Sequence, residues 1–91
     1  MKAQKVTIRG KRWNLEFVRL RKNWGECDPP DKPRKAIRIR SSLKGGDRLN
    51  TIIHEVLHAG HWELKEDVVD ELASDIERIL TKLGYELNEK G

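Results

Sequence analysis

The sequence predicts an α+β fold: a small antiparallel or mixed sheet of about three strands, packed with two antiparallel helices. Two observations support this class. In the first half of the chain apolar residues alternate with polar ones, which is the spacing of half-buried strands. In the second half they recur every three or four residues, as on one face of a helix. With 91 residues there is room for a single domain, residues 1–91, around one modest core.

The strands are expected in three segments. Residues 6–9 and 13–17 each alternate apolar and polar side chains, and Gly10-Lys11 between them can turn the chain, so these two strands form a hairpin. Residues 23–34 hold three prolines and a glycine, which is typical of a loop. Residues 35–43 resume the alternation and predict a third strand.

Two amphipathic helices follow. Asp47 is a good N-cap, because its carboxylate can accept hydrogen bonds from the free N–H groups of a first turn, and residues 48–61 show helical periodicity behind it. A corner at residues 60–64 leads to a second helix from near Glu66 to about Leu83, where the next residue is a glycine. The short corner makes the two helices antiparallel.

Cysteine usage and the N-terminus indicate the compartment. One cysteine, Cys27, excludes an internal disulfide and fits a reducing environment. Residues 1–9 contain no apolar stretch of the signal-peptide kind, and no segment is long and apolar enough to span a membrane. We therefore expect a cytoplasmic protein. Cys27 has no second cysteine near it, so we expect a buried small residue or a bystander thiol rather than a metal ligand.

Charge is divided unevenly along the chain. Residues 1–50 carry 15 Lys and Arg against 5 Asp and Glu, whereas residues 51–91 carry 4 against 10. We expect a solvated basic sheet face beside an acidic helical layer; the alternative is a nucleic-acid contact through the basic N-terminal half. Trp13 and Trp24 could stack on bases in that alternative, but we expect both in the core.

The motif that indicates chemistry is residues 54–58, HEVLH. His54 and His58 are four apart, so their imidazoles leave the same helix face and can bind one zinc ion at about 2.0–2.1 Å. Glu55 lies about 100° around the helix, beside the metal rather than on it. There it can act as general base on a zinc-bound water, whose pKa the metal lowers toward about 7.

A catalytic zinc needs a third protein ligand. An antiparallel second helix passes beside the histidines, and Glu71 on it is our first choice as ligand, with Asp75 one turn later orienting a ligating histidine. Glu66 and Asp70 are the competitors. His61 shares the face of His54, but residues seven apart on a straight helix are about 10 Å apart along its axis. We therefore expect an outer or substrate-side role for His61, or exposure beyond the helix end.

Residues 54–58 resemble the HExxH helix of the zincin metallopeptidases, and residues 70–76 (DELASDI) are similar to the E-x-x-x-D stretch of gluzincins such as thermolysin. The resemblance implies that Glu71 is a zinc ligand and that Asp75 orients a histidine. The link from His58 to Glu71 is, however, shorter than in the large gluzincins.

The order of sheet, HExxH helix and short second helix also resembles small phage-type metallopeptidases of the SprT-like and repressor-cleaving kinds, over about residues 35–83. Their acidic ligand stands in an E-x-x-A-[N/S] setting, which maps onto Asp70 here. Leu64 stands where metzincins have a third histidine. Tyr85, the one tyrosine, follows the second helix, so no oxyanion-stabilising group is evident.

The resemblance implies a zinc-dependent metallopeptidase acting on a peptide or protein, as an endopeptidase rather than an exopeptidase. It also implies that the strand before the active helix, residues 35–42, is a sheet edge that binds substrate by strand addition. Two other functions remain open: a nucleic-acid-associated module with a structural zinc, and a degenerate zincin that binds a partner without catalysis. The intact Glu55 argues against the last.

Overall fold

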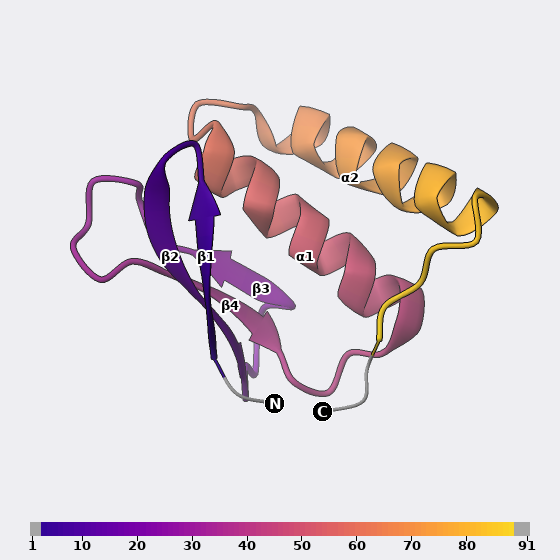
Figure 1. Cartoon of the computed structure of the whole chain (residues 1–91), viewed down its shortest axis with the longest axis horizontal. Helices are drawn as coiled ribbons and strands as arrows, with labels where there is room; N and C mark the ends of the chain where they lie inside the picture. Colours follow the sequence, from indigo (N-terminus) through magenta and orange to yellow (C-terminus); the bar gives the residue numbers. More distant parts are fainter. Residues whose placement is uncertain (1–2, 89–91) are drawn as a thin grey trace.

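Four strands and two helices make up residues 3–88, the part of the chain that this computed structural model describes (Figure 1). The predicted α+β class is confirmed, with four strands rather than three. The elements are β1 (Gln4–Ile8), β2 (Lys11–Val18), β3 (Gly25–Cys27), β4 (Ala36–Arg40), α1 (Gly45–Gly60) and α2 (Glu66–Lys82). Within this described part, no helix is both long and apolar enough to cross a membrane.

The strands form one mixed sheet in the order β1-β2-β4-β3. β1 and β2 are the predicted hairpin, β2 and β4 run parallel, and β3 pairs antiparallel with β4. The expectation that residues 35–42 form the sheet edge is therefore wrong, because β4 has neighbours on both sides. The edge beside the helices is β3, which the sequence analysis placed in a loop because its three residues are too few to show an alternation.

The core lies between the sheet and α1. Trp13, Ile37 and Ile39 are at most 1% exposed, and they belong to a cluster that includes Ala59 of α1. The prediction for Trp13 is confirmed. The prediction that Trp24 lies in the core is wrong, because its side chain is 49% exposed. Trp24 immediately precedes the edge strand β3, and the sheet has no further strand there to cover it.

α2 forms a third layer, packed on α1 and not on the sheet (Figure 1). Its predicted bounds are confirmed. It ends in a Schellman motif, in which Gly84 has φ +90°, Gly84 N–H donates to the Thr81 carbonyl at 3.0 Å and Tyr85 N–H donates to the Leu80 carbonyl at 2.9 Å. α1 begins earlier than expected, at Gly45. Asp47 therefore lies in the first turn, where its charge suits the helix dipole, and is not the N-cap.

One buried acid fixes the chain around the edge strand. Asp28, directly after β3, is 7% exposed and accepts hydrogen bonds from Arg38 Nη2 at 2.6 Å and Nη1 at 3.3 Å, and from the Ala36 backbone N–H at 2.9 Å. The Arg38 guanidinium lowers the pKa of the Asp28 carboxyl from 3.8 to about 2, against the opposing effect of burial. The same carboxylate thus holds both ends of the loop that joins β3 to β4.

We expect Asp28→Asn to lower the free energy of unfolding by about 2 kcal/mol at neutral pH. Because the folded-state pKa of Asp28 is depressed, this stabilisation is complete above pH about 4 and is lost as the pH falls toward about 2. Urea unfolding of both proteins across this range checks it. Asp31→Asn, an exposed acid of the same loop, is the control and should change little. A deficit of Asp28→Asn that stays constant down to pH 2 contradicts the assignment.

Candidate metal centre

The antiparallel contact of α1 and α2 aligns a row of polar side chains across the two helices. His58 faces Glu66, His54 faces Asp70, and one turn further along Asn50 Nδ2 donates to Ser74 Oγ at 3.3 Å. From one pair to the next, the residue number falls by four on α1 and rises by four on α2, as expected for antiparallel helices. Five connecting residues, 61–65, set this register.

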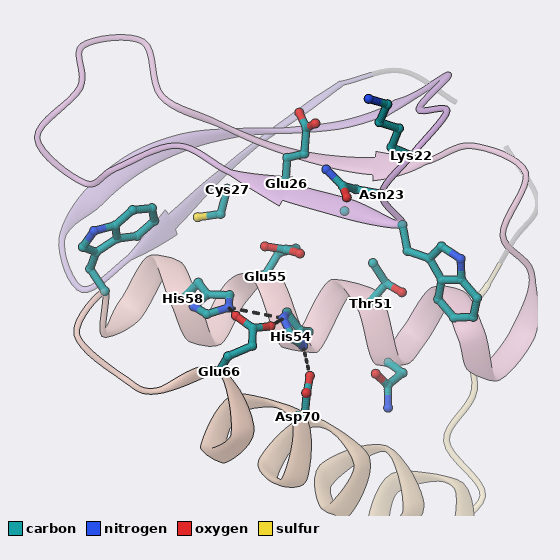
Figure 2. Close-up of a pocket in the computed structure, with 14 residues that line it drawn as sticks. Lys22, Asn23, Glu26, Cys27, Thr51, His54, Glu55, His58, Glu66 and Asp70 are labelled. Atoms are coloured by element: carbon teal, nitrogen blue, oxygen red, sulfur yellow. Dashed lines mark hydrogen bonds and ion pairs between the residues drawn. The ribbon is translucent and has the colours of Figure 1, made fainter.

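Glu66, the first residue of α2, lies across both histidines. Its Oε1 is 2.8 Å from His54 Nε2 and its Oε2 is 3.1 Å from His58 Nε2, while the two Nε2 atoms are 3.2 Å apart (Figure 2). Among the residues described, His54, His58 and Glu66 form the group whose potential ligand atoms all lie within 4.8 Å of one another. Neighbouring ligands of a tetrahedral zinc are about 3.3 Å apart, so the donor set fits that ion in type and in spacing.

Asp70 lies behind this group rather than in it. Its Oδ1 is 3.2 Å from His54 Nδ1, the ring nitrogen that faces away from Glu66 (Figure 2). A carboxylate on the far nitrogen of a ligating histidine fixes the tautomer that leaves Nε2 free for a metal, and it raises the basicity of the ring. Asp70 therefore lies where such an orienting carboxylate would stand, a place in which Asp75 was expected.

Glu71, the residue expected as third ligand, and Asp75 do not belong to this group. They lie one position past Asp70 and Ser74, and one residue turns a helix by about 100°, so both point away from α1's histidines. Both are exposed, and Asp75 forms an ion pair with Arg78 instead. Glu66, Asp70 and Ser74 lie on the stripe of α2 that faces the histidine stripe of α1, and this choice of stripe depends on the register in which the two helices pack.

Glu55 occupies the floor of the site. Its side chain belongs to α1, is 7% exposed, and lies in Figure 2 between the histidines and the β3 ribbon. Burial raises the pKa of the Glu55 carboxyl to about 7; nearby His54 lowers it and the charge of Glu66 raises it. A cation held by the two histidines would favour the ionised form.

These residues open into a cleft of about 860 Å³ above α1. α1 is its floor, β3 with the residues before it is one wall, and the start of α2 is the other (Figure 2). Trp24 and Trp62 also line the cleft and are 49% and 43% exposed, so apolar surface is available to a ligand at both the β3 wall and the connector between the helices. Trp62 stands in the corner between the two helices, where no pattern in the sequence predicts a role for it.

Gly25 allows the edge strand to approach the floor closely. A Cβ atom at this position would lie 2.8 Å from Thr51 Cγ2 and 2.9 Å from both Cγ and Oε2 of Glu55. A Cβ atom there would require the side chains of Thr51 and Glu55, or β3 itself, to move. Gly25 therefore sets the distance between β3 and the proposed general base.

Cys27 and His61 stand outside the metal group. Burial raises the pKa of the Cys27 thiol to about 12, with further increases from Glu55 and Asp28, so the sulfur is protonated at neutral pH. His61 is the exposed residue directly after α1 and does not line the cleft.

Comparison with known proteins adds no relative: no protein-family model, no curated protein and no solved structure matches the chain.

We expect Gly25→Ala to destabilise the fold by about 1–3 kcal/mol, the usual cost of forcing an extra methyl group into a packed contact. Gly60→Ala is the matched control, because a Cβ there would meet Ile8 Cγ2 at an ordinary 3.5 Å. Urea unfolding of the two variants measures the difference. Equal stability of both would show that β3 is not held against Glu55 as closely as described.

Proposed function

We propose that this protein is a zinc-dependent metallopeptidase that hydrolyses peptide bonds in a peptide or protein substrate. One observation carries the proposal: His54, His58 and Glu66 converge on one point, and the carboxylate of Glu55 lies beside that point in an open cleft. Two imidazoles and a carboxylate with an open fourth position are the ligand set of catalytic zinc sites, whereas structural zinc sites are closed by four protein ligands.

Each residue of the site has its own role in the proposed reaction. A zinc ion bound by His54, His58 and Glu66 would supply a Lewis acid for the peptide carbonyl and would lower the pKa of a water molecule. Glu55 takes a proton from the attacking water and returns it to the leaving amine. Asp70 holds the His54 ring in the orientation and tautomer that its role requires.

The free edge of β3 provides a place for the substrate backbone. Arg40 N–H donates to the Trp24 carbonyl at 2.7 Å and Asp28 N–H to the Ala36 carbonyl at 3.1 Å, so the two residues that flank β3 bond to β4. By the alternation of an antiparallel pair Glu26, opposite Arg38, is also turned toward β4. In an antiparallel pair the residues between them point their N–H and C=O groups the other way. These are Gly25 and Cys27, beside the cleft, and an extended substrate can pair with them as an added strand.

The openness of the cleft favours internal segments of a chain. β3 and the connector wall off its sides, yet no element among those described closes it over the histidines (Figure 2). An extended segment can therefore pass through, which favours an endopeptidase. Trp24 and Trp62 offer exposed rings to apolar side chains of such a segment.

Zinc binding provides the first test. We expect about one zinc ion per chain, held in competition with a chromophoric chelator. Asp70→Asn should weaken zinc binding by about 10- to 100-fold, the usual effect of losing a residue that orients a metal ligand. Glu66→Gln removes a ligand itself and should weaken zinc binding by more than that. Glu71→Gln, on the neighbouring stripe, is the matched control and should bind as the wild type does. Normal zinc binding by Glu66→Gln, or no zinc in the wild type, contradicts the ligand set.

Glu55→Gln tests the chemistry separately from the metal. We expect the variant to keep its zinc and to lose about 10²- to 10⁴-fold in kcat/KM on a library of unstructured peptides, because the amide cannot accept the proton. Mass spectrometry of the library with and without a chelator measures cleavage. If the zinc-loaded wild type leaves all peptides intact, the result would favour the alternative of a degenerate zincin that binds a partner without catalysis. Such a protein needs the metal but not the general base.

A further inference from the structure

A separate cleft of about 460 Å³ lies where β1, β2 and the residues just before β4 meet. In β1 and β2 the inward residues include Val6 and Trp13, so the alternation turns Lys5 and Asn14, which are partners in the strand register, to the outer face of the sheet. The cleft is lined by Lys5, Arg12, Trp13, Asn14, Arg34 and Lys35. It shares no residue with the cleft at the histidines.

Four of the six lining residues are cationic and none is acidic. Among the residues described, no carboxylate lies within 4.0 Å of any of the four; Lys5 Nζ donates to Asn14 Oδ1 at 3.2 Å, and Lys35 Nζ lies 5.6 Å from the centre of the Trp13 ring. Arg38, on the same sheet face, is by contrast neutralised by Glu26 and Asp28. Mutually repelling cations around one hollow are stabilised when an anion enters it.

One of these cations, Arg34, has an unfavourable backbone conformation. Arg34 has φ +54°, the left-handed region that residues other than glycine rarely adopt. The neighbouring Lys35 carbonyl accepts a hydrogen bond from Asn14 N–H at 3.0 Å, which joins the end of the loop to β2. The loop from β3 and the hairpin thus meet at the cleft, and each contributes two of its cations.

We propose that this cleft binds phosphate groups of a nucleic-acid backbone. A chain of phosphates fits better than a single one, because the four cations come from separate segments around an open hollow. The Trp13 ring is 1% exposed and offers no face for base stacking, so binding is independent of sequence. The separate position of the histidine site leaves its cleft free while nucleic acid is bound.

Fluorescence anisotropy of the full chain with a labelled mixed-sequence DNA duplex of about 20 base pairs tests this. We expect the logarithm of the affinity to fall with the logarithm of salt concentration at a slope of about −3.6, for four phosphate contacts. The double variant Arg12→Gln/Arg34→Gln should reduce that slope by about 1.8 and weaken binding at least tenfold near 0.1 M salt. Both side chains are exposed, so the fold should be unaffected.

Lys65→Gln/Lys82→Gln is the matched control, since it removes the same charge from exposed positions on the helical layer. It should bind DNA almost as the wild type does. An equal loss in the control would show attraction by net charge and no site, and would overturn the proposal. So would undetectable wild-type binding at low salt, or full displacement of the duplex by millimolar inorganic phosphate, which would indicate a single-phosphate pocket.

Discussion

The antiparallel packing of α2 on α1 is the constraint on which the candidate site depends. The two histidines alone are a stripe on one helix, and a third donor must come from elsewhere in the chain. Five connecting residues turn α2 back so that its first residue meets the last turns of α1, where Glu66 reaches both imidazoles at about hydrogen-bond distance. The next turn of the same face brings Asp70 to His54. A connector that shifted this register by one residue would present a different stripe of α2 to the histidines.

The other wall of the cleft is held by quite different means. β3 has three residues and pairs with a single strand, which gives it little stability of its own. The buried carboxylate of Asp28 compensates by joining the end of β3 to Arg38 and to the start of β4. Gly25 then lets the strand lie against α1 at Glu55. A short edge strand thus becomes a fixed wall with backbone groups turned toward the cleft.

Charge distinguishes the two proposed sites. The basic first half supplies the sheet, and four of its cations line the cleft where β1, β2 and the residues just before β4 meet. The acidic second half supplies α2 and the carboxylates beside the histidines, which suits a cation. The two sites therefore attract ligands of opposite charge, and they differ in chemistry as well as in position.

The sequence by itself determined the fold class, the hairpin, both helices and the pairing of His54 and His58 with Glu55, because periodicity and spacing along one element are local properties. Only the tertiary structure decided that β4 is interior, that β3 is the edge and that Glu66 rather than Glu71 faces the histidines. These depend on which elements become neighbours and in what register. Acids on several faces of a helix look alike in sequence, and a rotation of about 100° separates a ligand from a solvated charge.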